Sequence, residues 1–224
     1  MTAFSRYARI TGVCLFLVLA WEATGLDFWL TSLVASTDGF AARDHWILAL
    51  VLHEGGRALS GLLLALLAVC VLWPRDVVLG LSRRRRLWLL LAVASAMLLV
   101  SALKRLSATS CPWDLQGLGG TFAWVPHLRW GEVDGGPGHC FPAGHASAGF
   151  AWIAGYFAWP RAHPMARRWL LTAVAAGLLL GVAQQLRGAH FMSHTLWTAW
   201  ICWAWTGLLA LGHWQEAAHA PAAD

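Results

Sequence analysis

"RRRRLWLLLAVASAMLLVSALKRL", residues 83–106, places an arginine run before an apolar stretch and a lysine–arginine pair after it. The apolar stretch from 87 to 103 is long enough to cross the hydrocarbon core of a bilayer, which takes roughly 17 to 25 residues. Arginine-rich connections remain in the cytoplasm, so residues 83–86 mark the inner end of the helix and Lys104 its outer end. The segment therefore predicts a membrane-spanning helix of defined direction.

The whole chain has the composition of a polytopic membrane protein. Of its 224 residues, 58% are hydrophobic, 12% are charged and 16 are tryptophan, which leaves no room for a large soluble domain. We therefore expect an all-α fold in a single membrane-embedded domain covering residues 1–224. The predicted six transmembrane helices are centred within 10–30, 55–73, 87–103, 143–159, 169–186 and 191–212.

The arginines predict the orientation of these helices. Ten of the fifteen arginines fall on one side if successive helices alternate in direction, and the positive-inside rule makes that side, with both termini, cytoplasmic. We expect a protein of the bacterial inner membrane whose other face is periplasmic. The net charge of +5 follows from this topology, so no nucleic-acid partner is needed to explain it. The arginines on the inner side are Arg6, Arg9, Arg75, Arg83, Arg84, Arg85, Arg86, Arg161, Arg167 and Arg168.

The longest polar connection, residues 104–142, is predicted to be a periplasmic loop and is the expected place for chemistry. Cys111 and Cys140 bracket it. In an oxidising compartment the two would form a disulfide. Two reduced thiols and a pair of metal ligands remain alternatives.

Two separate segments bring anion-binding groups to the periplasmic end of the predicted bundle. Lys104 follows the third span, and "PAGH", residues 142–145, begins the fourth. The free N–H groups and the dipole of a helix start attract anions, and His145 in the first turn can donate a proton to a leaving oxygen. The alternatives are a lysine that only extends to the interface and a structural turn with an interfacial histidine.

A third segment, "RGAHFMSH" at 187–194, reaches the same membrane level. The Arg187 guanidinium is suited to phosphate oxygens, and a neutral imidazole can attack phosphorus. His190 and His194 are also spaced four residues apart, as two metal ligands on one helix face would be. Phosphate chemistry and metal binding both remain open for this pair.

These segments together resemble the type 2 phosphatidic acid phosphatase superfamily of integral membrane lipid phosphatases. The first motif of that family is a lysine, six residues and then Arg-Pro; this chain has Lys104 and Pro112, with Cys111 in place of the arginine. The second is Pro-Ser-Gly-His, which residues 142–145 match except for Ala143. The first motif is thus degenerate, whereas the second lacks only a hydroxyl.

The third family motif is Ser-Arg, five residues, a histidine, three residues and an aspartate. His190 matches the histidine, but Ala183 and Gln184 replace Ser-Arg and His194 replaces the aspartate. The resemblance covers roughly residues 87–212, and its order, spacing and sidedness all agree.

The resemblance implies a role for each matching residue. His190 would be the nucleophile that forms a phosphohistidine, and His145 would protonate the leaving group. No metal or other cofactor would be required, because fixed cations replace it. The phosphoryl oxygens would be bound by Lys104, Arg187 and the N–H groups of Ala143 and Gly144.

The departures from the family pattern require substitute groups. His194 can orient His190 only as a neutral acceptor, so a carboxylate from another segment is a candidate partner: Glu54, with Asp114 and Glu132 of the loop as rivals. Arg57 or Arg105 would replace the arginine absent at position 111. Glu22 and Asp27 in the first span are costly in lipid, and we expect them to pair with another helix or to reach the surface. The list of support candidates is Glu54, Arg57, Arg105, His194 and Asp114.

The sequence thus predicts a metal-independent lipid phosphatase that cleaves a phosphate monoester or diphosphate at the periplasmic face. Candidate substrates are phosphatidic acid, phosphatidylglycerol phosphate, undecaprenyl diphosphate and lipid A. A lipid phosphotransferase using the same intermediate is the alternative within this chemistry. A membrane metal- or haem-binding protein and a non-catalytic binder of lipid phosphate are alternatives of another class.

Overall fold

The computed structural model describes residues 2–73, 77–78, 80–129 and 131–219, so Arg75 lies outside the described residues. The described chain is mostly helical, as predicted, with one short hairpin of β1 (Val77–Val78) and β2 (Leu81–Ser82). The helices are α1 (Ala3–Glu22), α2 (Leu26–Ser32), η1 (Ile47–Gly55), α3 (Gly56–Leu72), α4 (Arg83–Leu106), η2 (Pro112–Asp114), α5 (Gly144–Phe150), η3 (Ala151–Ile153), α6 (Ala154–Ala158), α7 (Pro164–Leu186) and α8 (Met192–His219).

Four helices in the described part of the chain are long and apolar enough to cross a membrane. The first lies nearer the N-terminus than predicted, because Gly25 adopts a left-handed φ of 69° and separates α1 from α2. The predicted total of six spans and the direction of the termini remain predictions. The four candidate spans are Phe4–Glu22, Ile47–Leu72, Arg83–Leu106 and Pro164–Leu186.

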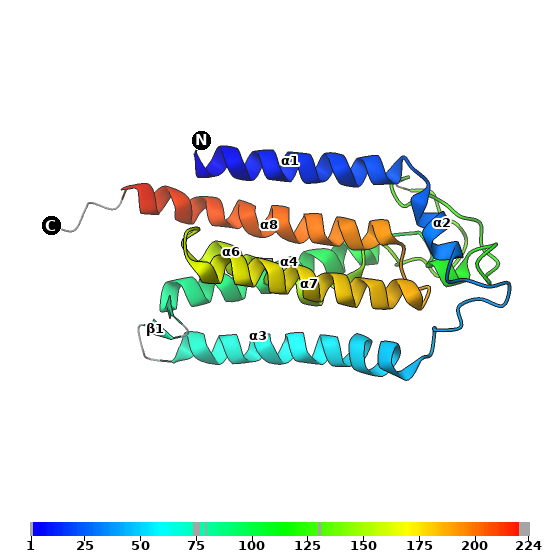
Figure 1. Cartoon of the computed structure of the whole chain (residues 1–224), viewed down its shortest axis with the longest axis horizontal. Helices are drawn as coiled ribbons and strands as arrows, with labels where there is room; N and C mark the ends of the chain where they lie inside the picture. Colours follow the sequence, from blue (N-terminus) through cyan, green and yellow to red (C-terminus); the bar gives the residue numbers. More distant parts are fainter. Residues whose placement is uncertain (1, 74–76, 79, 130, 220–224) are drawn as a thin grey trace.

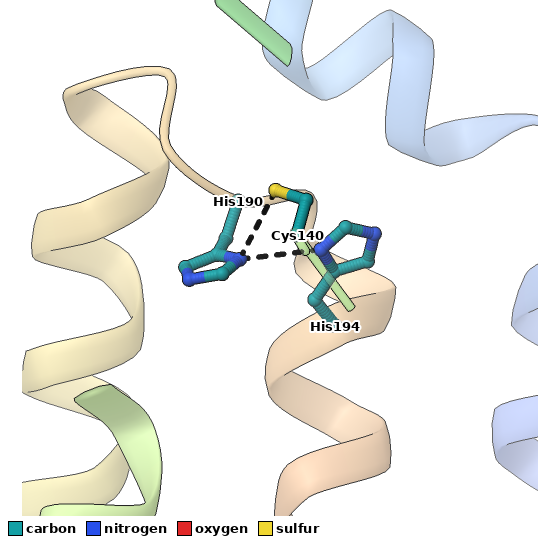
Figure 2. A group of neighbouring side chains, drawn as sticks. All are labelled: Cys140, His190 and His194. Atoms are coloured by element: carbon teal, nitrogen blue, oxygen red, sulfur yellow. Dashed lines mark hydrogen bonds between the residues drawn. The ribbon is translucent and has the colours of Figure 1, made fainter. Parts of the chain in front are cut away.

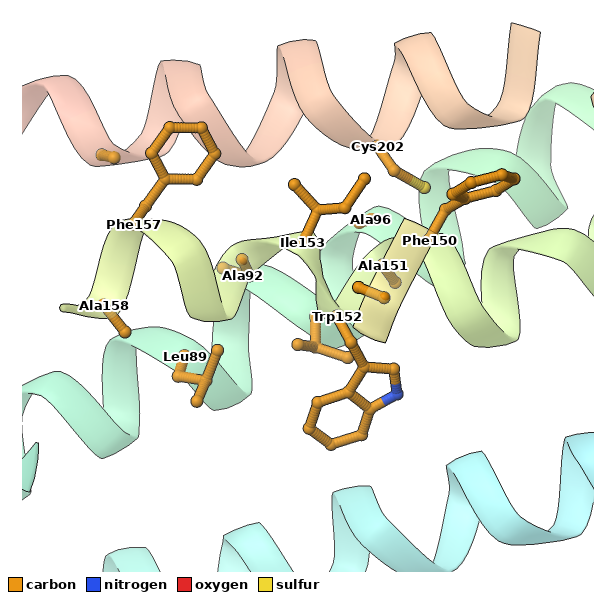
Figure 3. Packing of buried hydrophobic residues seen from close by; sticks show 14 of the residues in the cluster. Leu89, Ala92, Ala96, Phe150, Ala151, Trp152, Ile153, Phe157, Ala158 and Cys202 are labelled. Atoms are coloured by element: carbon orange, nitrogen blue, oxygen red, sulfur yellow. The ribbon is translucent and has the colours of Figure 1, made fainter. Parts of the chain in front are cut away.

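The predicted span at 143–159 is not among these four. It consists of α5, η3 and α6 in succession, and every residue from 146 to 155 is buried. Figure 3 shows Phe150, Ile153 and Phe157 pointing from this segment toward its helical neighbours. The segment packs against α4, α7 and α8, so it forms the centre of the hydrophobic core.

Small residues let α5 approach α7 closely. A Cβ atom added at Gly149 would overlap the backbone of Ala176 and Gly177. A Cβ atom added at Gly177 would overlap the ring of Phe150. The two backbones therefore meet through glycine, as small-residue contacts between membrane helices commonly allow.

The connections between helices gather at two opposite ends of the molecule. Figure 1 shows the start of α1, the end of α8 and the β1 hairpin at one end, and α2 at the other. The arginine-bearing segments 83–86 and 161–168 lie at the same end as the start of α1 and the end of α8. Residues 107–143, which we call the outer loop, lie at the end of α2 (Figure 1).

The outer loop is packed and tethered. A disulfide joins Cys111 to Cys140, the pairing that the sequence left open. The backbone N–H of Trp113 donates to the carbonyl oxygen of Gly188 at 2.9 Å, which attaches the loop to the α7–α8 connection. A second hydrophobic cluster lies beneath the loop, and its buried members are Phe40, Leu115, Leu118 and Phe191.

Candidate active site

His190 and His194 are in direct contact at the start of α8. Their Nδ1 atoms lie 3.2 Å apart, so one ring donates a hydrogen bond to the other (Figure 2). Cys140 Sγ lies 3.6 Å from the same nitrogen of His190. In Figure 2 the other ring nitrogen of His190, Nε2, points away from both neighbours. Nε2 is therefore the nitrogen of His190 that is available to react.

The surroundings of His190 favour its neutral form. The residue is 1% exposed, and this burial lowers its pKa well below the usual value, with Lys104 and His145 adding positive charge in the same direction. A histidine with such a pKa is neutral at pH 7. Its imidazole thus retains the lone pair that a nucleophile needs.

Lys104 extends from the last turn of α4 alongside the start of α5. A Cβ atom at Gly144 would lie 3.3 Å from Lys104 Cδ and 3.9 Å from its Nζ, so the glycine makes room for this side chain. The lysine lies within electrostatic reach of both His145 and His190. The first and second motifs therefore meet in space.

Ala143 is less suited to bind phosphate than the sequence suggested. Its N–H donates to the carbonyl oxygen of His194 at 3.3 Å, which joins the start of α5 to the first turn of α8. A donor already engaged in this way cannot also be a free anion-binding group. Gly144 is the better candidate, because N–H groups in the first turn of a helix have no partner within the helix.

His145 lies in a cluster of cations. Lys104, Arg57 and Arg187 are all within its electrostatic reach. The ring of His53 lies against it, with the ring centroids 3.8 Å apart. His145 Nδ1 is buried and has no hydrogen-bond partner among the described residues. The cluster is a region of positive charge around a histidine, and such a region is suited to binding a phosphate group.

Arg187 is held at the C-terminal end of α7. Its Nε donates to the carbonyl oxygen of Arg43 at 2.7 Å, and its Nη1 donates to Gln184 Oε1 at 3.2 Å. Gln184 occupies the third-motif position where the resemblance places an arginine. In this chain it instead orients an arginine one turn further along.

The other support candidates lie apart from His190. Glu54 contacts His53 Nδ1 at 2.8 Å and Arg57 Nη1 at 3.5 Å, so it belongs to the cation cluster and is not the partner of the nucleophile. Within the described part of the chain, neither Arg105 nor Asp114 has a side-chain hydrogen bond or ion pair with the site. Arg105 is exposed on α4, and Asp114 lies in η2 of the outer loop.

Sequence reasoning missed His127, which lies in the outer loop. Its Nε2 contacts Glu22 Oε1 at 2.8 Å, and its ring is nearly perpendicular to that of His194 with centroids 5.0 Å apart. Trp197 Nε1 donates to the same oxygen of Glu22 at 2.8 Å. An irregular loop has no periodicity that would single out one histidine, so no pattern pointed to this residue.

Both carboxylates near the end of α1 are paired with other segments, as predicted for charges in a membrane segment. Asp27 accepts hydrogen bonds from Ser193 N at 2.9 Å and from Trp21 Nε1 at 2.8 Å. A carboxylate within a membrane segment is costly in free energy, and this cost was the one feature of the sequence that indicated a role for Glu22. That signal did not identify its partners.

The donor atoms for the metal alternative are present but altered. Cys140, His190 and His194 place one donor atom each within 4.8 Å of one another. Cysteine binds metals as a thiolate, and the sulfur of Cys140 is bonded to Cys111. The two histidines that remain do not complete a four-ligand zinc site.

Comparison with known proteins adds one result to this geometry. The model of the PAP2 superfamily matches residues 85–217, which include Lys104, His145 and His190. Neither the curated proteins nor the solved structures give a match to this chain. The match covers more than half of the sequence and all three groups that meet at the site. The chain therefore belongs to the PAP2 superfamily, the type 2 phosphatidic acid phosphatases.

Proposed function

We propose that the protein is a lipid phosphatase that works through a phosphohistidine on His190. Members of the family are phosphatases, which supports a phosphoric ester hydrolase in general. The observation that carries the finer proposal is the contact between His190 Nδ1 and His194 Nδ1, with Lys104 and His145 within electrostatic reach. It gives a neutral imidazole with Nδ1 engaged by His194 and Nε2 pointing away from it, and two cationic groups within electrostatic reach.

The proposed reaction has two steps. The lone pair of His190 Nε2 forms a bond to phosphorus while the bond from phosphorus to the lipid oxygen breaks, and protonated His145 gives its proton to that oxygen. A water molecule then attacks phosphorus and returns a proton to His145. The bond from His190 to phosphorus breaks, and inorganic phosphate leaves.

The cations around His145 supply the electrostatic part of this mechanism. Lys104 and Arg187 would bind the phosphoryl oxygens, where charge develops in the transition state. A bound phosphate dianion would in turn favour the protonated form of His145 among these cations. Because His190 is only 1% exposed, substrate must displace neighbouring side chains before it reaches Nε2.

A lipid is the substrate class that suits this position. The site lies where α4 and α7 end and α5 and α8 begin, at the end of an apolar helical bundle. An acyl or prenyl chain can remain in the bilayer while the head group meets the cations. We place this end at the periplasmic face because the arginine-rich segments lie at the other end.

The test is phosphate release by purified protein in EDTA from phosphatidic acid, phosphatidylglycerol phosphate, undecaprenyl diphosphate and lipid A. We expect release from at least one of these lipids and a loss of at least about a thousandfold in His190→Ala, because the nucleophile is absent. His45→Ala removes an exposed histidine at the same end of the molecule and is the matched control.

Inactivity of the wild type on the whole panel, or full activity of His190→Ala, would contradict the proposal. Mass spectrometry of rapidly quenched enzyme should find a phosphoryl group on the peptide that contains His190. Phosphorylated lipid product without free phosphate would identify the phosphotransferase alternative.

A further inference from the structure

A nucleophilic histidine develops a charge that His194 cannot neutralise. When Nε2 bonds to phosphorus, the ring of His190 still carries hydrogen on Nδ1 and becomes a cation. His194 accepts that hydrogen but is itself uncharged, and Lys104 and His145 nearby add further positive charge. The phosphoryl group on Nε2 is an anion, but the N–H on the opposite side of the ring, at Nδ1, faces the uncharged His194. An anion on the far side of His194 would therefore stabilise the positive charge on that side of the ring.

Glu22 is the carboxylate that the fold places there. His127 lies between them: its ring packs edge-to-face on His194, and its Nε2 contacts Glu22 Oε1 at 2.8 Å. The side chains of His127 and Glu22 are only 6% and 18% exposed. Solvent screens a pair in such a position much less than a surface pair.

The carboxylate is also fixed in position. Trp197, one turn beyond His194 on α8, donates its indole N–H to Glu22. The ring of Phe141 stacks on His127 with centroids 4.1 Å apart and meets the edge of His194 at 5.3 Å. Three segments, α1, the outer loop and α8, thus hold the Glu22 carboxylate in place, with His127 between it and His194.

The neighbouring carboxylates are engaged elsewhere. Asp27 accepts from the backbone of Ser193 and from Trp21, and Glu54 pairs with His53 and Arg57. Among the described carboxylates, Glu22 is the one joined through a histidine to His194.

We propose that Glu22, through His127 and His194, supplies the negative charge that orients His190 and stabilises its cationic form during phosphoryl transfer. This inference rests on the proposed function. Glu22 acts here as a positioning residue, because it touches neither the phosphoryl group nor His190. Glu22, at the end of α1, would supply the negative charge that the neutral His194 does not provide.

The first test is the kinetics of Glu22→Gln and Glu22→Asp in the purified full-length protein. Glutamine retains the size and an oxygen acceptor for Trp197 but removes the charge. We expect kcat to fall about tenfold, equivalent to about 1.4 kcal/mol of transition-state stabilisation, with KM unchanged because Glu22 does not contact substrate. Glu22→Asp fits less well but keeps the charge, so it should retain more activity than Glu22→Gln.

Repeating the Glu22→Gln measurement in a protein that also carries His194→Asp distinguishes an electrostatic role of Glu22 from a structural one. His194→Asp places a carboxylate directly beside His190, so Glu22→Gln should then change kcat less than about twofold if the two charges are alternatives. Asp27→Asn is the matched control, since it removes a carboxylate with a similar pair of hydrogen bonds from the same part of the chain. It should change kcat by the same factor in both backgrounds.

Distinct results would overturn this inference and the proposed function. An active wild type in which Glu22→Gln has full kcat, or loses the same factor with and without His194→Asp, refutes the role of Glu22 alone. If His194→Asp does not fold, an activity of Glu22→Asp no higher than that of Glu22→Gln refutes it equally. A wild type that releases no phosphate from any lipid refutes the proposed function instead.

Discussion

The surroundings of His190 depend on residues that lie outside the three family motifs. Sequence order and sidedness were enough to predict that Lys104, His145 and His190 would lie at the same end of the bundle, and they do. The partners around them come from a π-helical turn carrying His53 and an irregular loop carrying His127. Neither segment has a periodic pattern from which a side-chain direction follows, so these contacts could not be predicted.

The burial of His190 predicts that acid weakens the folded protein. Its pKa is lowered in the folded state by burial, whereas in the unfolded chain it returns to about 6.5. Below that pH the unfolded state binds a proton at His190 that the folded state does not bind. The free energy of unfolding therefore falls as the pH decreases, by up to about 1.4 kcal/mol per pH unit for this one histidine. Melting temperatures in detergent at pH 7.5, 6.5 and 5.5 should decline more steeply for the wild type than for His190→Asn. The same slope in both proteins would contradict the prediction, and His45→Asn provides the exposed control.

At the scale of elements, the segment 143–159 shows where hydropathy is ambiguous. A helix that is apolar on all sides is compatible with lipid contact and with a protein core, and sequence alone does not distinguish the two. In the structure residues 146–155 are all buried, and the segment is divided into α5, η3 and α6. Gly149 and Gly177 indicate that the segment is packed against another helix. That indication can be recognised only once α5 and α7 are known to be neighbours.

The glycine contact between α5 and α7 predicts a stability effect. Gly149→Ala introduces a methyl group against the backbone of Gly177, which cannot yield as a side chain would. We expect a loss of about 1 to 3 kcal/mol, the usual scale for overpacking a tight core. Gly61→Ala is the matched control, since this helical glycine of α3 has no atom within 4 Å of an added Cβ. Unfolding in detergent measures both variants, and equal stability of the two would contradict the assignment of α5 to the core.

For the whole molecule, the arrangement in Figure 1 joins the charge pattern to the site. The arginine-bearing connections, the start of α1 and the end of α8 lie at one end, while the disulfide, the outer loop and the cation cluster lie at the other. This separation follows from alternating helix direction and could be predicted from sequence. The packing inside the end that carries the outer loop could not be predicted. It depends on contacts between α1, residues 107–143 and α8, which are distant from one another in sequence.

The orientation of the protein in the membrane can be tested by labelling introduced cysteines. The positive-inside rule places the arginine end in the cytoplasm, and the outer loop would then face the periplasm, where the disulfide can form. Val133→Cys introduces a thiol on the outer loop, at a position that is 73% exposed, and Ala162→Cys introduces one in the exposed turn between α6 and α7. A membrane-impermeant maleimide applied to intact cells should label Val133→Cys above the wild-type background but label Ala162→Cys only after the cells are permeabilised. Labelling in the reverse order would place the site on the cytoplasmic face. A phosphatase with that orientation would act on lipids of the inner leaflet, so the result also decides which pool of lipid phosphate can reach His190.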